Sequence, residues 1–182
     1  MRGQSSVEFG LSAIVLVLLV FGLIDLGRVF YFDVALTGAA REGARQATWF
    51  DPANSSNPNP SLYDAAIQST VDAVLKHSGL PPSTLGNPGT TCPSSTDGNA
   101  DYNPPYIDAT YPGTVNQPVL FICYSNLPGL DLSSAPTDNT YRGTDVNVIL
   151  VMNFGFVSGF MQGVLGNSVH IVANTHMAVG GY

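Results

Sequence analysis

The sequence predicts an α+β protein in which a long N-terminal helix packs on a small head with an antiparallel β-sheet and one further helix. All 13 prolines of the 182-residue chain lie between Pro52 and Pro136, so both ends are free to form long regular elements. Residues 9–24 form an uncharged apolar run. Two segments after residue 140 alternate in polarity and are rich in β-branched residues, which is typical of strands.

The N-terminal segment is predicted to be one helix over residues 4–50 that ends before Asp51-Pro52. Such a helix is roughly 70 Å long at about 1.5 Å per residue. Its first half is apolar on every side, whereas its second half is amphipathic. The sequence therefore divides into residues 1–3, a helix at 4–50 and a head at 51–182.

Small residues recur on one stripe of the amphipathic half. They stand four positions apart, at Ala35, Ala39, Gly43 and Ala47. Small side chains let a second helix or a sheet approach the helix backbone closely. Two interpretations stay open: an assembly surface for another subunit, or a face packed on the protein's own sheet.

Charged residues on the helix are spaced to neutralise one another. Asp25 and Arg28 lie three positions apart, as do Glu42 and Arg45, and Arg41 shares a face with Arg45. We expect solvated or intersubunit pairs on the helix and no catalytic cluster.

The middle of the chain, residues 52–140, is mostly irregular and contains one predicted helix. Ser61 is expected to cap this helix and Gly79 to end it. Its apolar face is formed by Leu62, Ile67, Val71, Val74 and Leu75. Residues 80–118 are predicted to be loop, and a strand is expected at 119–125.

The two cysteines, Cys92 and Cys123, enclose most of this irregular stretch. A disulfide between them would stabilise the fold by roughly 3–4 kcal/mol on the chain-entropy model. A long irregular segment favours such a crosslink, provided that the head lies in an oxidising compartment.

The C-terminal part is predicted to form two strands, at 145–154 and 168–178. The segment between them, "GFVSGFMQGVLG", is apolar and rich in glycine. We expect it to cover the sheet or to meet another subunit, because a plain loop of this composition would expose too much apolar surface.

Composition argues against two classes of function. The net charge is −7, and after residue 45 only Lys76 and Arg142 stand against nine aspartates, so a basic surface for nucleic acid is not expected. No spacing typical of a nucleophilic triad, a phosphate loop or a CxxC pair occurs. His170 and His176 would lie roughly 20 Å apart on one strand, too far to share a metal. We therefore expect neither an enzyme nor a cofactor.

One segment resembles a calcium loop in part. Oxygen-bearing side chains recur at Asp97, Asn99, Asp101, Asn103 and Asp108. However, Tyr102 stands where the motif has glycine, and Pro104 and Pro105 exclude the second flanking helix. We favour turn chemistry here; an irregular calcium site is the alternative.

The apolar run after Glu8 permits three interpretations. A secretory signal peptide fits poorly, because the run passes into a charged helix without a small-residue cleavage site. A plain single-span anchor has adequate length but leaves Glu8 unexplained, since a charge at the edge of hydrocarbon is costly and usually functional. The third interpretation rests on a resemblance.

"RGQSSVEF" resembles the cleavage site of type IV prepilins, and "IDLGRVFYFDVALTGAAREGAR" resembles the TadE-like family of the tight-adherence (Flp-type) pilus systems. The resemblance implies that residues 1–3 are a leader and that a prepilin peptidase cuts between Gly3 and Gln4. Glu8 then becomes the fifth residue of the mature chain, where it can neutralise the new amino group on the same or a neighbouring helix.

The resemblance also implies a function. The protein is expected to be a structural subunit of a type IV pilus that assembles through its N-terminal helix into an adhesive filament. Its implied partners are other pilin subunits, the inner-membrane assembly platform and membrane lipid. Before assembly it would cross the cytoplasmic membrane once with its N-terminus inside, and afterwards lie outside the cell. The alternative is a permanently anchored extracellular binding module that does not polymerise.

Overall fold

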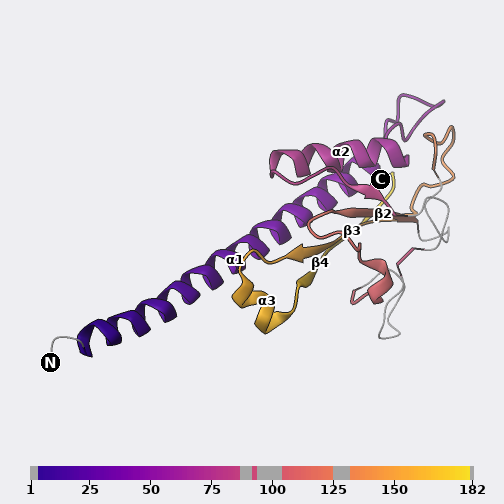
Figure 1. Ribbon diagram of the computed structural model, residues 1–182. Helices are drawn as coiled ribbons and strands as arrows, with labels where there is room; N and C mark the ends of the chain where they lie inside the picture. The colour runs from indigo at the N-terminus through magenta and orange to yellow at the C-terminus, as the bar shows by residue number, and fades with distance from the viewer. Residues whose placement is uncertain (1–3, 87–91, 94–103, 125–131, 181–182) are drawn as a thin grey trace.

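A computed structural model describes residues 4–86, 92–93, 104–124 and 132–180. Helix α1 (Gln4–Ala47) is a single rod, and the head packs against its C-terminal half (Figure 1). Helix α2 (Asp64–His77) lies beside α1 on one side of the sheet. The predicted class, a long N-terminal helix packed on an α+β head, is confirmed.

The sheet has four strands in the order β1-β2-β3-β4. A short parallel pair joins β1 (Thr84–Leu85) to β2 (Val119–Tyr124), and the other pairs are antiparallel. The longest pair is β3 (Asp145–Gly155) with β4 (Ser168–Ala178), in register from Asp145 opposite Ala178 to Gly155 opposite Ser168. The predicted strands at 145–154 and 168–178 are therefore confirmed.

The main core lies between this sheet and the two long helices. Side chains alternate along a strand, so every second residue of β3 faces the helices. These residues are buried: Val146, Val148, Leu150, Met152 and Phe154. The opposite face of β3 carries Ile149 and Val151, which pack with Tyr106 and Cys123 in a smaller cluster. β3 is thus covered on both faces, which explains its nearly continuous apolar sequence.

The predicted helix ends need two corrections. α1 stops at Ala47 and not at residue 50, and the Thr48 hydroxyl donates to the backbone oxygen of Arg45 at 3.0 Å. Ser61 does not cap α2, which begins at Asp64 after an extended Tyr63. The Ser61 hydroxyl oxygen instead accepts a hydrogen bond from Gln46 at 2.9 Å, so it links the end of α1 to the segment that precedes α2. Gly79, with φ of +69°, ends α2 as predicted.

The irregular stretch between α2 and β2 is held by the predicted crosslink. Cys92 and Cys123 form a disulfide with their Cα atoms 6.0 Å apart, and Cys123 lies in β2. The described part of this stretch also contains β1 and a 3₁₀ turn, η1 (Asp108–Thr110), where only loop was predicted.

Candidate functional site

The first half of α1 is exposed and apolar. An 18-residue window of this helix has a mean hydropathy of 2.6, and none of it is buried by the rest of the protein. By length and composition, the helix can cross a membrane. Large side chains that point outward include Phe9, Leu11, Leu16, Leu19 and Leu23. Burying these side chains requires lipid or another protein chain.

Glu8 is exposed at the start of this apolar surface. Its carboxylate accepts a hydrogen bond from the side-chain amide of Gln4, one helical turn earlier, at 3.3 Å. Gly3, on the other side of the predicted cleavage point, lies outside the described residues. Gln4 and Glu8 are therefore close together on the exposed end of the helix.

The small-residue stripe packs inside the protein and is not exposed for assembly with another subunit. Ala35, Ala39, Gly43 and Ala47 are all buried within the head. A Cβ added at Gly43 would lie 2.6 Å from a methyl of Val71 on α2 and 3.5 Å from one of Val148 on β3. The stripe thus lets α2 and the sheet approach α1, which is the second of the two interpretations.

Asp25 makes contacts that sequence reasoning missed. Asp25 was expected to form a solvated or intersubunit pair with Arg28. Its side chain is instead buried, with 1% of its surface exposed. Both carboxylate oxygens accept hydrogen bonds from the turn after β3: from the backbone amides of Val157 (3.1 Å) and Ser158 (3.0 Å), and from the Ser158 hydroxyl (2.5 Å). The predicted pair with Arg28 is present as well, at 3.3 Å.

Arg28 completes this junction. Its guanidinium lies over the rings of Phe154 (4.9 Å) and Phe32 (5.7 Å), so one cation contacts both α1 and β3. The Asp25–Arg28 pair therefore fixes the head to α1 at the end of the apolar run. The sequence contained a signal for Ser158, since a serine before a short apolar segment is typical of a helix N-cap. The bond from Ser158 to Asp25, 133 positions earlier, could not be inferred.

Helix α3 (Gly159–Leu165) begins at this junction. The Ser158 hydroxyl oxygen caps the helix by accepting from the Met161 amide at 3.3 Å. The sulfur of Met161 lies 3.8 Å from the position of a Cβ added at Gly22, so α3 contacts α1. The apolar connection between the strands was expected to cover the sheet or meet another subunit. Its buried Phe156 joins the core, but α3 has no buried residue.

Other predicted charged groups are ordinary surface pairs. Arg45 donates to Glu42 from Nε at 2.9 Å, and this hydrogen bond lowers the pKa of the Glu42 carboxyl. His176 pairs with Asp145 at 3.1 Å, while the ring of His170 stacks on Tyr111 with centroids 3.7 Å apart.

The calcium hypothesis falls mainly outside the described residues. Asp97, Asn99, Asp101 and Asn103 all lie there, and Asp108 is exposed at the start of η1. Within the described part of the chain, no group of three or more His, Cys, Asp and Glu side chains is arranged to hold a metal.

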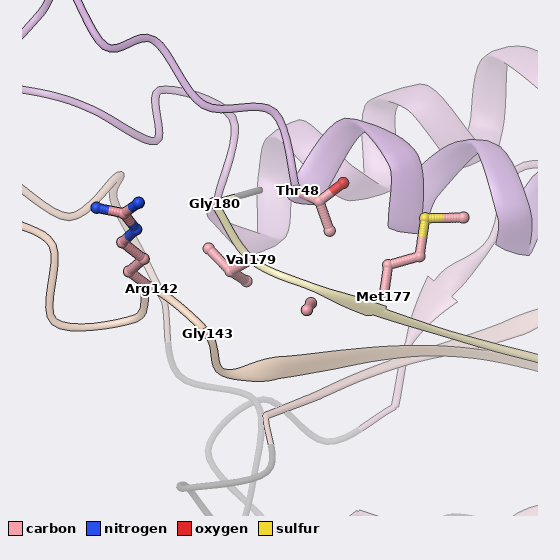
Figure 2. Close-up of a pocket in the computed structure, with 7 residues that line it drawn as sticks. Thr48, Arg142, Gly143, Met177, Val179 and Gly180 are labelled. Carbon is pink, nitrogen blue, oxygen red and sulfur yellow. The ribbon is translucent and has the colours of Figure 1, made fainter. Parts of the chain in front are cut away.

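An open pocket of ≈ 570 Å³ lies where the end of α1 meets the start of β3 and the end of β4. Figure 2 shows Arg142 and Met177 at its two sides, with Val179 between them. Among the described residues that line it, Arg142 alone is ionisable, and its guanidinium lies over the Phe50 ring at 5.6 Å. Acid–base chemistry needs paired groups, and the described part of this lining holds no such pair.

These features define a pilin-like α+β protein, with a long apolar-then-amphipathic helix whose second half is the core of a small head. Residues 3–45 match the model of the family TadE-like protein, which confirms the resemblance seen in the sequence. The match covers nearly all of α1 and none of the head beyond it. A search of curated proteins and a search of solved structures found no match.

Proposed function

We propose that this protein is a structural, pilin-like subunit of a Tad (Flp-type) type IV pilus. It is held in the cytoplasmic membrane by the first half of α1, with the head outside, and later assembles with other pilin subunits through the same helix. Its partners are the prepilin peptidase, the inner-membrane assembly platform and lipid. The role is assembly and surface attachment rather than catalysis.

One observation carries the proposal. The segment that matches the TadE-like family contains an apolar helical surface that the rest of the protein leaves bare. A helix of this kind is stable only in lipid or packed against other helices, and a filament subunit uses both environments in turn. Because the stripe at Ala35–Ala47 is buried in the head, it is not available to another subunit. The exposed first half of α1 is therefore the surface proposed for subunit contacts.

Processing gives Glu8 its role in this proposal. A membrane peptidase hydrolyses the peptide bond between Gly3 and Gln4, which leaves an α-amino group that is largely cationic at neutral pH. Residues one turn apart on a helix have their Cβ atoms roughly 5–6 Å apart. The carboxylate of Glu8 on the same or an adjacent subunit neutralises this cation, because an unpaired charge opposes packing among apolar helices.

The test is the intact mass of the protein isolated from its native membranes and from sheared surface filaments. The proposal predicts a chain that begins at Gln4 in the filament fraction. Intact mass reads the start point even when the amino group is blocked. A filament fraction containing only the form that begins at Met1 would overturn the processing step.

A second function is a permanently membrane-anchored extracellular binding module. It is favoured by one observation, the burial of the small-residue stripe within the head, which removes one surface that could have packed against a neighbour. The two proposals differ in where the protein is found. A binding module stays in the membrane fraction with Met1 retained, and shearing of the cells releases none of it.

A further inference from the structure

We propose that the β3–β4 connection, residues 156–166, is a second membrane-contact element whose ligand is the lipid surface. It would lie in the interfacial layer of the bilayer, beside the point where α1 leaves the hydrocarbon. The proposal rests on the proposed function only in taking the first half of α1 to be in a membrane.

The first support is the position of this segment. It extends from the ends of β3 and β4 and lies against the middle of α1, on the N-terminal side of the head (Figure 1). Asp25 holds its first turn through Val157 and Ser158, and Met161 contacts α1 at Gly22. The segment thus lies beside the last turn of the uncharged run that ends at residue 24.

The second support is the character of its exposed side chains. Val157, Phe160, Val164 and Leu165 are exposed by between 43% (Phe160) and 73% (Val157). The sequence carries no Asp, Glu, Lys or Arg after Asp145, so the segment itself contributes no such charge to this surface. The segment adjoins the apolar surface of α1, because Met161 contacts α1 at Gly22.

The third support is that several polar groups of the segment are paired within the protein. The Ser158 hydroxyl donates to Asp25 and accepts from the Met161 amide. The side-chain amide of Gln162 donates to the Phe156 oxygen at 2.9 Å, and the Gly166 amide donates to the Gln162 oxygen at 3.0 Å. Backbone and side-chain groups that enter lipid must be paired in this way, whereas a segment in water has no such need.

The fourth support is the depth at which the segment lies. The uncharged run of α1 between Glu8 and Asp25 spans about 24 Å, less than the roughly 30 Å of a hydrocarbon core. The segment beside its outer end therefore lies at the boundary, where short amphipathic elements bury their apolar side about 5–10 Å deep. Exposed Tyr31 follows one to two turns after Asp25, and tyrosine is enriched at this level.

The experiment uses tryptophan as a depth probe in the full-length chain. Trp49 is the only native tryptophan, so Trp49→Phe provides a silent background. Three single reporters are added separately: Phe160→Trp in α3, Leu16→Trp in the apolar run, and Ile107→Trp before η1. Ile107 is a matched control because it is 43% exposed, as Phe160 is, but is next in sequence to Tyr106, which packs in the cluster on the other face of the sheet.

Each reporter is reconstituted in phosphatidylcholine–phosphatidylglycerol vesicles with nitroxide quenchers attached near the headgroup or deep in the acyl chain. Aqueous acrylamide is the third quencher. We expect Leu16→Trp to be quenched most by the deep nitroxide. Phe160→Trp should be blue-shifted, quenched most by the shallow nitroxide and protected from acrylamide, whereas Ile107→Trp should be quenched by acrylamide alone.

The outcomes separate this inference from the proposed function. If Phe160→Trp behaves like Ile107→Trp while Leu16→Trp is quenched by lipid, the anchor stands and the second contact is wrong. If Phe160→Trp is protected from acrylamide but not quenched by either nitroxide, the segment contacts a second protein copy and the inference is again overturned. If Leu16→Trp is not quenched by lipid, both the anchor and the inference fail.

Two further variants test whether the junction positions the segment. In the Phe160→Trp background, Asp25→Asn keeps the size of the side chain but weakens its bonds to Val157 and Ser158. We expect this change to shift quenching of the reporter from the shallow nitroxide toward acrylamide. Asp33→Asn, an exposed carboxylate farther along α1, should leave the quenching pattern unchanged.

Discussion

The carboxylate of Asp25 on α1 accepts two hydrogen bonds from Ser158, which lies 133 positions later in the chain. This contact joins the end of the apolar run to the turn after β3. It lies next to Arg28, which pairs with Asp25 and lies over the Phe154 ring of β3. It is the farthest point toward the N-terminus at which the described part of the head bonds to α1 through side-chain hydrogen bonds.

Replacing Asp25 by Ala should destabilise this junction. The change leaves the amides of Val157 and Ser158 without their acceptor and Arg28 without its anion. A lost hydrogen bond to a charged group costs about 1.5–3 kcal/mol, so we expect faster amide hydrogen exchange at residues 157–161. Exchange measured by mass spectrometry in detergent tests this. The same change at exposed Asp33 is the control, and equal exchange in both variants would contradict the assigned role.

Alanine at two glycines of α1 should have opposite effects. A Cβ at Gly43 meets a Val71 methyl at 2.6 Å, whereas Gly38 has open space. Overpacking costs about 1–3 kcal/mol, and alanine regains up to about 1 kcal/mol of helix propensity. Gly43→Ala should therefore lower the free energy of unfolding by up to about 2 kcal/mol, while Gly38→Ala raises it by up to about 1 kcal/mol. Denaturant titration followed by Trp49 fluorescence measures both, and effects of the same sign would refute the packing described.

Reduction of the disulfide should weaken the head. The bond joins residues 31 positions apart, and closing such a loop contributes roughly 3–4 kcal/mol on the chain-entropy model. We expect dithiothreitol to lower the denaturant midpoint of the native protein. A variant with Cys92→Ser and Cys123→Ala is the control, because its already lowered midpoint should not respond to the reductant.

Alkaline pH should unfold the head through its buried tyrosines. Burial raises the pKa of Tyr124 and of Tyr106 well above their ordinary value of about 10. A pKa that is higher in the folded state contributes stability that is fully present below pH about 10 and is lost as the pH rises further. Absorbance of phenolate should therefore appear in two stages, the second together with unfolding. Tyr124→Phe should reduce the amplitude of the second stage, and a single early transition would contradict the burial.

Glu8 is predicted to act in assembly and not in folding. Glu8→Ala and Glu8→Gln both remove the charge that balances the new amino group, so both should reduce the yield of sheared filaments. The head should fold normally in both, with its disulfide formed and its unfolding midpoint unchanged. Asp33→Ala, which removes an exposed charge elsewhere on α1, is the matched control. Normal filament yield in both Glu8 variants would exclude the pairing mechanism.

Much of this fold was predictable because its signals are local. The proline-free ends indicated α1 and the β3–β4 pair, and Gly79 marked the end of α2. Ser61 misled the prediction because a serine before an apolar run is a common cap, whereas here tertiary contact with Gln46 uses its hydroxyl. The stripe at Ala35–Ala47 was ambiguous, since close approach by a neighbour and by the protein's own sheet require the same small residues.

The junction at Asp25 could not be predicted for a different reason. A hydrogen bond between residues 25 and 158 depends on where the sheet sets the turn after β3 relative to α1, and no local pattern encodes that distance. The pairing of Asp25 with Arg28 was visible because three positions on a helix bring side chains together whatever the tertiary structure.

One continuous helix forms both the extended N-terminal stem and part of the core of the head. Four residues of its second half have no exposed surface: Leu36, Ala39, Ala40 and Ala44. Tension applied to the N-terminal end is therefore carried straight into the packed interior, with no hinge or tether in between. A truncated protein that begins at residue 51 would lack the α1 residues of this core, so α2 and the sheet would lose the helix against which they pack.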